Sequence, residues 1–452
     1  MQLQFLGATG TVTGSKYLLQ HPSNNILIDC GLFQGFKQLR LRNWKPLPFS
    51  PKNIDAVMLT HAHIDHSGYL PLLVKNGFNG PIYCSTATQA LCQVLLLDSA
   101  KLQEEEAHYL NKHQFSKHKP ALPLYTREDA QNALALFKPV DFYQEKKIGE
   151  LFFHLLPTGH ILGSAMVYIH DKETSILFSG DLGRQKDLIM NPPAIVKHAD
   201  YLVVESTYGN RTHAPSDPLE KLAEIINRTI SRGGKVIIPT FAVGRAQLLL
   251  YCIHLLKKNG TIPQHLPVYL NSPMAVEATA IFDEHPGEYR LTPEQSEAMC
   301  KTAHIIFDVE ESKLLNAKKE PLIILAGSGM ATGGRIVHHL KAFAPDQKNT
   351  ILFSGFQAGG TRGAAMLDGA KEIKIHGEYV PVNAEIALID NLSAHADANE
   401  IIAWLKHFDT PPKQTFITHG EPIAADALRL KIEETLNWAA YVPDYLEKVD
   451  LT

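Results

Sequence analysis

The chain has 452 residues, of which 45% are hydrophobic and 20% are charged, a composition typical of globular proteins and unlike that of disordered or fibrous chains. This length exceeds what one hydrophobic core usually supports, so we expect two domains, or one domain that carries a large insertion. The formal net charge of −4 excludes a broad basic surface of the kind that binds duplex nucleic acid non-specifically.

Membrane and secretion signals are missing from the sequence. No segment approaches the run of about 18 apolar residues that a membrane helix requires. The first residues, MQLQFLGATG, do not combine a basic start with an apolar stretch. The 5 cysteines are widely spaced and form no CxxC pair, which indicates reduced thiols. We therefore predict a cytoplasmic protein with no membrane partner.

The first 205 residues are rich in predicted strands. Apolar runs bounded by Gly, Asn and Asp predict short strands, and two segments have a helical pattern. The predicted strands are residues 2–6, 15–20, 25–29, 56–60, 151–156, 165–170, 175–178 and 201–205, and the predicted helices are residues 67–76 and 86–115.

Beyond residue 209 helices and strands alternate, a pattern that favours a parallel α/β sheet. The predicted helices here are residues 217–231, 245–257, 397–407 and a last one to about 438; the predicted strands are residues 235–239, 268–270, 322–326, 350–353, 386–389 and 414–418.

The segment His61-Ala62-His63-Ile64-Asp65-His66 follows a predicted strand directly. Four ligand-type side chains within six residues are not explained by packing alone, and imidazole with carboxylate suits zinc. The i, i+2 spacing of His61 and His63 lets both rings point to one ion. Asp65 and His66 can then point to a second ion.

Three further ligand-type residues also follow predicted strands. His160 lies in PTGHILGS, Asp181 in SGDLG and His419 in THGE. A carboxylate at position 181 could bridge two ions, which is the arrangement that many phosphoryl-transfer sites use. Taken alone, each of the two histidines is more often a structural residue, so their interpretation depends on the cluster.

The order of HxHxDH, GHxxGS and SGD resembles the metallo-β-lactamase superfamily. Glu205 within VVESTYG, His395 within SAHAD and His419 within THGE are similar to motifs A, B and C of its β-CASP subgroup. The chain length resembles short bacterial and archaeal relatives of the endonuclease subunit of the cleavage and polyadenylation specificity factor. The similarity covers essentially the whole chain.

The resemblance implies an α/β fold, a metallo-β-lactamase αβ/βα sandwich with an inserted α/β β-CASP domain. The lactamase domain would comprise residues 1–208 and 386–452, and the β-CASP domain residues 209–385. The resemblance also implies two Zn²⁺ ions per chain. The ligands would be His61, His63 and His160 for one ion, Asp65, His66 and His419 for the other, and Asp181 as a bridge, with Asp29 supporting the site from outside.

The same resemblance implies a ribonuclease that hydrolyses single-stranded RNA, and it allows a homodimer. DNA-processing members typically carry valine at motif C, so His419 favours RNA. Three alternatives stay open at this point: a β-CASP DNA nuclease, a small-molecule metallo-hydrolase of the same fold, and a catalytically inactive RNA-binding partner.

Hydrolysis of RNA would use a metal-activated water, which Asp65 could orient while it serves as a ligand. His395 could donate the proton to the leaving oxygen, with Glu205 holding its ring. Internal cleavage is expected, and 5′-to-3′ exonuclease activity could accompany it.

Gly-rich turns in the inserted domain are the expected phosphate-binding segments. The residues concerned are Arg245, Ser328, Thr332, Gly333, Arg335 and Arg362. Tight backbone packing is an equally good explanation of each such turn taken alone.

Overall fold

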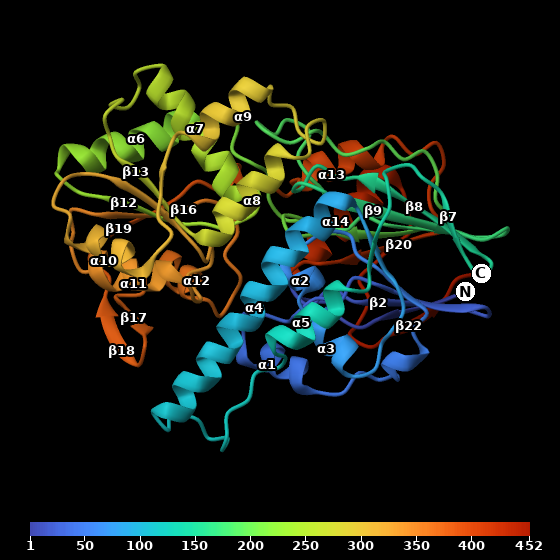
Figure 1. The fold of residues 1–452 in the computed structure, drawn as a ribbon. Coiled ribbons are helices and arrows are strands. Elements are labelled where there is room, and N and C mark those ends of the chain that lie inside the picture. The colour runs from blue at the N-terminus through green and yellow to red at the C-terminus, as the bar shows by residue number, and fades with distance from the viewer. The chain divides into compact units, whose positions relative to one another are not determined.

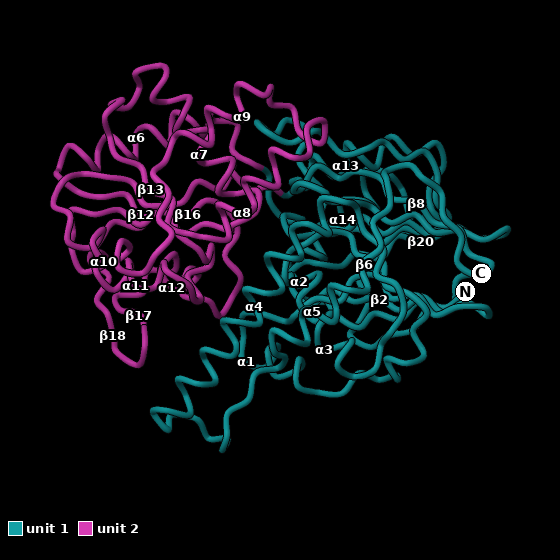
Figure 2. Tube along the Cα trace, in the orientation of Figure 1, with its two compact units in different colours: residues 1–212, 395–452 teal, residues 213–394 magenta.

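The computed structural model describes residues 1–452 and divides the chain into two compact units. Unit 1 comprises Met1–Thr212 and His395–Thr452, and unit 2 comprises His213–Ala394 (Figure 2). Unit 2 is thus inserted into unit 1. The strand at 386–389, which the sequence assigned to the C-terminal part of the first domain, pairs with a strand of unit 2, so the observed division lies further along the chain.

Unit 1 contains two seven-stranded sheets. Across the first sheet the strands are β22 (Lys448–Asp450), β1 (Gln2–Phe5), β2 (Tyr17–His21), β3 (Asn24–Ile28), β4 (Ala56–Met58), β5 (Ile82–Cys84) and β6 (Phe137–Pro139). Across the second they are β21 (Ala440–Tyr441), β20 (Gln414–Thr418), β11 (Tyr201–Glu205), β10 (Ser175–Phe178), β9 (Ala165–His170), β8 (Leu151–Pro157) and β7 (Lys146–Ile148).

The two sheets bury one apolar core between them. Leu19, Ile28 and Met58 of the first sheet share this core with Val167 and Phe178 of the second, and each of these side chains is at most 1% exposed. Removing this apolar surface from water is the main force that joins the sheets.

Helices cover the outer faces of the sandwich (Figure 1). The second sheet packs against α13 (Ala398–Leu405) and α14 (Pro422–Leu436) through a second apolar cluster. On the side of the first sheet, α5 (Arg127–Leu134) contacts both α3 (Leu70–Lys75) and α4 (Thr86–Lys112), and α4 contacts β6. Shorter helices are α1 (Lys37–Arg40), α2 (Ile64–Ser67), η1 (Leu41–Trp44), η2 (Pro51–Asn53) and η3 (Asp390–Leu392), the last in unit 2.

Unit 2 is built on a six-stranded parallel sheet. Its strands in spatial order are β14 (His304–Ile305), β13 (Val268–Asn271), β15 (Ile323–Ala326), β12 (Val236–Pro239), β16 (Thr350–Phe353) and β19 (Glu385–Leu388), with a separate hairpin of β17 (Glu372–Ile375) and β18 (Glu378–Pro381). Its helices are α6 (Pro218–Ser231), α7 (Arg245–Lys258), α8 (Pro273–Asp283), α9 (Pro293–Cys300), α10 (Val309–Ala317), α11 (Arg335–Phe343) and α12 (Arg362–Leu367).

Most predicted elements are confirmed. The parallel α/β sheet predicted for the inserted segment is also confirmed. The prediction of one helix over 67–76 was wrong. Gly68 ends the short helix α2, and Pro71 lies in the first turn of α3, where proline is favoured. The three-residue strands β5, β6 and β7 were missed because so short a segment shows no periodicity.

No helix in the structure has both the length and the apolar character needed to cross a membrane.

Candidate metal centre and active site

Five of the predicted site residues lie at the ends of parallel strands or within three residues beyond them. Asp29 follows β3, Asp181 lies beyond β10, Glu205 ends β11 and His419 follows β20, while His61 lies beyond β4. The pairs β3–β4, β10–β11 and β11–β20 are parallel. Because parallel strands end at the same edge, residues distant in sequence are brought to one rim of the sandwich.

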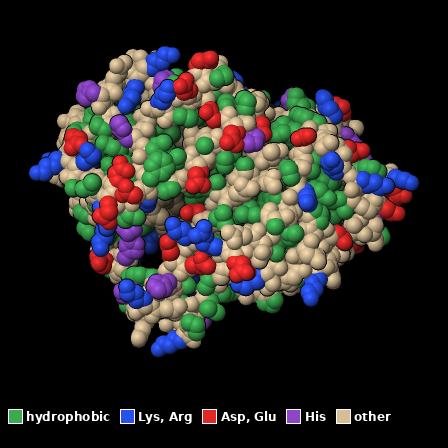
Figure 3. Space-filling model, viewed as in Figure 1, with side chains coloured by type: hydrophobic (Ala, Val, Ile, Leu, Met, Phe, Trp, Pro, Cys, Tyr) green, Lys and Arg blue, Asp and Glu red, His purple; other side chains and the backbone are tan.

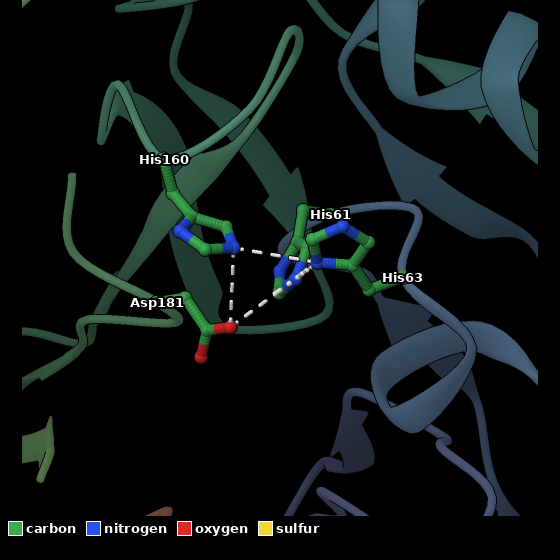
Figure 4. Close-up of side chains that lie close together, drawn as sticks. All are labelled: His61, His63, His160 and Asp181. Atoms are coloured by element: carbon green, nitrogen blue, oxygen red, sulfur yellow. Dashed lines mark hydrogen bonds and ion pairs between the residues drawn. The ribbon is translucent and has the colours of Figure 1, made fainter. Parts of the chain in front are cut away.

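The first ligand group consists of His61, His63, His160 and Asp181, whose ligand atoms all lie within 4.8 Å of one another. The Nδ1 atom of His63 lies 3.1 Å from Nε2 of His61 and 3.3 Å from Nε2 of His160. Figure 4 shows the three rings and the Asp181 carboxylate facing one another. Two imidazole nitrogens thus converge on a third, a set of donors that suits a metal ion.

The second ligand group consists of Asp65, His66 and His419, again within 4.8 Å. The Nε2 atoms of His66 and His419 are 3.1 Å apart, and Nε2 of His419 lies 3.4 Å from Oδ2 of Asp65. Asp65 and His66 both belong to α2, which begins just after His63, so one short helix supplies two of the three side chains.

Asp181 lies between the two groups. Its Oδ2 is 3.4 Å from Nε2 of His61 and 3.5 Å from Nε2 of His160. Its Oδ1 is 3.3 Å from Nε2 of His66 and 3.5 Å from Nδ1 of His419. One carboxylate therefore presents an oxygen to each group, which is the arrangement of a bridging ligand.

Three of the five ligand histidines have a ring nitrogen that contacts a polar group of the surrounding protein. Nδ1 of His66 donates to Oδ2 of Asp29 at 2.8 Å, and Nδ1 of His61 lies 3.1 Å from Oγ1 of Thr60. Nδ1 of His419 lies 3.0 Å from Oγ1 of Thr207. Metal-ligating histidines are oriented by such outer partners, so the residues present fit a metal ion in each group.

Burial determines the charge of the first group. It lowers the pKa of His61 and of His160 well below the usual imidazole value, and it lowers the pKa of His63 to about 4. These rings are therefore neutral at pH 7, as metal ligands must be. Burial also disfavours charge on His66, but the Asp181 and Asp29 carboxylates outweigh it and raise its pKa well above the usual value. Metal binding at His66 would consequently release a proton.

His395 and Glu205 form a hydrogen-bonded pair beside the first group. Nδ1 of His395 lies 3.1 Å from Oε1 of Glu205, and its ring centroid is 4.4 Å from that of His160. Glu205 is 1% exposed, and its oxygens accept from the backbone N–H groups of Leu182 at 2.7 Å and Thr207 at 3.2 Å. The carboxylate is thus fixed, and it orients the imidazole.

The Glu205 carboxylate also influences the protonation of His395. Burial alone would lower the pKa of this imidazole, but the negative charges of Glu205, Asp181 and Asp65 outweigh burial and raise it. The ring therefore tends to hold a proton, as a general acid does.

Close backbone packing holds the ligand loops together. A Cβ added to Gly31 would lie 1.6 Å from the backbone oxygen of Asp65, so only glycine fits there. Gly159 has a φ of +68°, and a Cβ on it would lie 1.9 Å from the carbonyl oxygen of Asn191. Glycine at 159 lets the chain turn tightly before His160.

The six predicted phosphate-binding residues all lie in unit 2, and two of the three arginines direct their guanidinium groups at oxygen atoms of the protein. The Arg335 guanidinium donates to Oδ1 of Asn271 at 2.6 Å and to the Ile306 carbonyl, and that of Arg362 donates to the carbonyls of Lys374, Ala331 and Thr332.

The loop between β15 and α11 has similar internal bonds. Oγ of Ser328 accepts from the backbone N–H groups of Thr332 at 3.0 Å and Gly333 at 3.3 Å, in the place that a phosphate oxygen would take. The Arg245 side chain is buried, at 9% exposed. The hydrogen bonds of Ser328, Arg335 and Arg362 are structural, and phosphate would have to compete with them.

Thr60 and Thr207 were missed by the sequence-based interpretation. Thr60 binds both Asp29 and His61, and Thr207 binds His419. Their signal was their position, since Thr60 immediately precedes the HxHxDH segment and Thr207 follows Glu205 by two residues.

Three family models match the chain. The metallo-beta-lactamase superfamily matches residues 9–220, the Beta-Casp domain matches residues 246–366, and a domain described as the Zn-dependent metallo-hydrolase RNA specificity domain matches residues 379–443.

Curated relatives align along almost the whole chain. Ribonuclease TTHA0252 of Thermus thermophilus is 35% identical over 431 residues, which cover 93% of either chain. Transcription termination factor FttA of Methanosarcina mazei is 33% identical over 99% of this chain and 71% of its own. A solved structure of a protein of unknown function from Enterococcus faecalis V583 shares the fold, with a TM-score of 0.54, 14% identity, and coverage of 100% of this chain and 99% of the other.

These matches confirm the resemblance seen in the motifs, together with the expected fold. The metallo-β-lactamase fold implies that the clustered His and Asp side chains bind divalent metal. The chain belongs to the β-CASP RNA-processing nucleases of the metallo-β-lactamase superfamily, a family of metal-dependent hydrolases.

Proposed function

We propose that this protein is an endoribonuclease that hydrolyses single-stranded RNA with two Zn²⁺ ions. RNA as the substrate is supported by the relative from Thermus thermophilus, which is named a ribonuclease, and by the RNA specificity domain that matches residues 379–443. The observation that carries the proposal is the pair of ligand groups that share Asp181, with the His395–Glu205 pair beside them.

The residues that would hold the ions are already oriented toward one another. One Zn²⁺ would take His61, His63 and His160, the other Asp65, His66 and His419, with Asp181 as the bridging carboxylate. When bound, two such ions lower the pKa of a coordinated water and polarise the phosphate.

Asp65 is the member of the ligand groups that is suited to orient the attacking water. Its side chain is 20% exposed, whereas those of His66, Asp181 and His419 are 4% exposed or less. Its carboxylate can therefore accept a hydrogen bond from the water that attacks the phosphate.

His395 is the proton donor in this proposal. Its Nδ1–H is directed at Glu205, so the ring is held in one orientation and its positive form is stabilised. The opposite ring nitrogen, Nε2, would deliver its proton to the leaving oxygen of the ribose. Attack by water rather than by the 2′-hydroxyl would leave a 5′-phosphate and a 3′-hydroxyl.

One assay separates this proposal from its alternatives. Zinc-loaded protein is incubated with circular RNA, with 5′-labelled linear RNA and with single-stranded DNA of the same sequence. We expect cleavage of the circular RNA, which has no end, with 5′-phosphate products. Cleavage of DNA alone would indicate a DNA nuclease, and no cleavage of any polynucleotide would indicate a small-molecule hydrolase or an inactive RNA-binding subunit.

The role of His395 is tested by His395→Ala with the metal content measured by mass spectrometry. General acids contribute about 100- to 10,000-fold to rate, so we expect at least a 100-fold loss of turnover with two zinc ions still bound. His338→Ala is the control, because His338 is an exposed histidine of α11. Full activity in His395→Ala would contradict the assignment.

The number of ions is tested by metal analysis of the purified protein, where we expect two zinc ions per chain. The homodimer stays a prediction, which light scattering after size-exclusion chromatography tests. The cytoplasmic location also stays a prediction.

A further inference from the structure

The far end of α4 carries exposed aromatic and basic side chains that the proposed mechanism does not use. We call the rings of Tyr109, His113 and Phe115 the distal platform. Between residues 107 and 126 the sequence has three lysines and three histidines and no Asp or Glu. In Figure 1 the end of α4 extends away from the sheets of its unit, and in Figure 3 side chains in the colours of Lys or Arg and of His lie on the surface there.

The rings of the distal platform contact one another in the open. The Tyr109 and His113 centroids are 4.5 Å apart, and the His113 and Phe115 rings are stacked at 5.6 Å. Tyr109 is 42% exposed and Phe115 is 66% exposed. Large aromatic side chains usually bury most of their surface, so a contiguous exposed set of rings marks a binding surface.

The chain around the platform is held in place. Asn111 donates through Nδ2 to the Ala121 carbonyl at 2.9 Å and accepts through Oδ1 from the Ala121 N–H at 2.7 Å. Gln103 accepts from the Leu124 N–H at 3.2 Å, and Ser99 lies 2.7 Å from the hydroxyl of Tyr125. Residues 121–125 are therefore fastened back along α4, and the Phe115 N–H donates to the Leu110 carbonyl at 3.0 Å, so both ends of the segment after α4 are held before binding.

Unpaired positive charge lies on the C-terminal side of the rings, whereas the acidic residues 104–106 lie about one turn before them on α4. Lys112, Lys117 and Lys119 are exposed, and none of them forms an ion pair in the structure. By contrast, Lys101, two to three turns earlier on the same helix, lies 3.9 Å from Glu105. The lysines beside the platform are thus available to an anionic ligand.

We propose that the distal platform is an auxiliary docking site for single-stranded RNA. Exposed rings stack on nucleotide bases without regard to sequence, and neighbouring lysines contact phosphates, which is how proteins bind single strands. Stacking explains the rings and phosphate contact explains the lysines, whereas an acidic protein partner would explain only the lysines. The inference rests on the proposed ribonuclease function for the identity of the ligand.

α4 also connects the platform physically to the metal centre. Its N-cap, Ser85, donates to the Gly163 carbonyl at 2.6 Å, and Thr88 donates to the same oxygen at 2.9 Å, three residues beyond His160. At about 1.5 Å per residue, Tyr109 lies about 35 Å along the helix from Thr86. A stacked strand with about 3.4 Å per nucleotide would need roughly ten nucleotides to reach from one site to the other.

The test compares a long RNA with a short one on the zinc-loaded, full-length protein. Fluorescence anisotropy measures binding of phosphorothioate oligouridylates of 30 and 4 nucleotides, the shorter being unable to span about 35 Å even at roughly 7 Å per nucleotide, twice the stacked rise. The variants are Tyr109→Ala with Phe115→Ala, and Lys112→Gln with Lys117→Gln and Lys119→Gln. Tyr143→Ala with Lys138→Gln is the control, since both residues are exposed on the same unit.

We expect the aromatic variant to weaken binding of the 30-mer about fivefold or more, because one stacked base contributes at least that factor. Binding of the 4-mer, which we expect at the metal centre, should not change. The lysine variant should also reduce the salt dependence of binding of the 30-mer. Unchanged affinity for the 30-mer in both variants, or an equal loss for the two lengths, would overturn the inference.

Failure of the inference and failure of the proposed function are distinguishable. If the wild-type protein cleaves RNA but the platform variants bind the 30-mer as the control does, only the docking site is wrong. If the variants lose affinity for the 30-mer but no RNA is cleaved, the docking site holds and the ribonuclease function is wrong. Circular dichroism spectra of all variants establish that they are folded.

Discussion

The substitution Asp29→Asn separates the orientation of a metal ligand from its identity. The Asp29 carboxylate is 1% exposed and accepts three hydrogen bonds. Oδ1 accepts from the Thr60 N–H at 2.8 Å, and Oδ2 accepts from the Thr60 hydroxyl at 2.9 Å and from Nδ1 of His66 at 2.8 Å. The backbone at Asp29 has a φ of +56°, a conformation that asparagine adopts as readily as aspartate, so the backbone should not change.

Either orientation of the new amide disturbs this arrangement. If the NH2 group replaces Oδ2, it faces Nδ1 of His66, and Nδ1 must then accept a hydrogen bond from it. The ring proton of His66 therefore moves to Nε2. That nitrogen is the atom directed at His419 and Asp181, so it could no longer bind metal. If the NH2 group replaces Oδ1, it meets the Thr60 N–H and leaves a buried donor unpaired, which costs about 1–3 kcal/mol.

The expected loss follows from the effect of outer partners on metal sites. Removing such a partner typically costs about 10- to 100-fold in metal affinity, which is about 1.4 to 2.8 kcal/mol. The loss should fall on the ion that His66 would bind, because no ligand of the other ion contacts Asp29 directly.

The measurement is a zinc titration at pH 7 against a chromogenic chelator, which resolves two dissociation constants. We expect one constant to rise 10- to 100-fold in Asp29→Asn and the other to change less than threefold. Asp55→Asn is the matched control, because Asp55 is an exposed aspartate that accepts one backbone hydrogen bond, from Asn25 at 2.7 Å. Two unchanged constants, or an equal loss at both sites, would refute the tautomer argument.

Three further predictions concern single residues. Glu205→Gln lowers the pKa of His395 toward its ordinary value, so His395 loses its proton at lower pH. We expect the alkaline limb of the pH profile of turnover to move to lower pH, with about a tenfold loss of turnover at pH 8. An alkaline limb that does not move would contradict the pairing of His395 with Glu205. Gly31→Ala places a Cβ 1.6 Å from the Asp65 carbonyl oxygen. We expect this clash to lower the free energy of unfolding by about 1–3 kcal/mol, measured by denaturant unfolding. We also expect it to weaken zinc binding, measured by the zinc titration described for Asp29→Asn. Burial lowers the pKa of Lys16 from 10.5 to about 8, so between these pH values the unfolded chain binds more protons than the folded chain. The free energy of unfolding should therefore rise by about 3 kcal/mol as the pH rises through this range. Denaturant titrations at pH 7.5 and 10.5 measure this rise, which should be missing from Lys16→Met.

Much of the ligand set could be predicted because it is local in the sequence. HxHxDH places four side chains in six residues, and the other ligands lie in short Gly-containing segments after apolar runs. An apolar run followed by a polar residue and a glycine predicts the end of a buried strand, and the ends of parallel strands are where sites form. The predicted strands before Asp181, Glu205 and His419 are confirmed.

Other features depended on contacts between segments that lie far apart in the chain. His395 and Glu205 are 190 residues apart, and only the return of the chain from unit 2 brings the imidazole to the carboxylate. Arg335 and Arg362 looked like phosphate-binding residues in the sequence, but the structure directs their guanidinium groups to carbonyls of unit 2. Which acceptor a flexible cationic side chain meets depends on folding and not on its neighbours in sequence.

The sequence by itself determined the family, the alternation of strands and helices, and the residue types that face the metal centre, because these are carried by short motifs and by hydrophobic periodicity. Only the tertiary structure decided that Asp181 presents one oxygen to each ligand group, that Thr60, Asp29 and Thr207 orient the histidines, and that the rings at the far end of α4 remain exposed. The reason is that direction, burial and hydrogen-bond partners arise when separate strands and helices pack together.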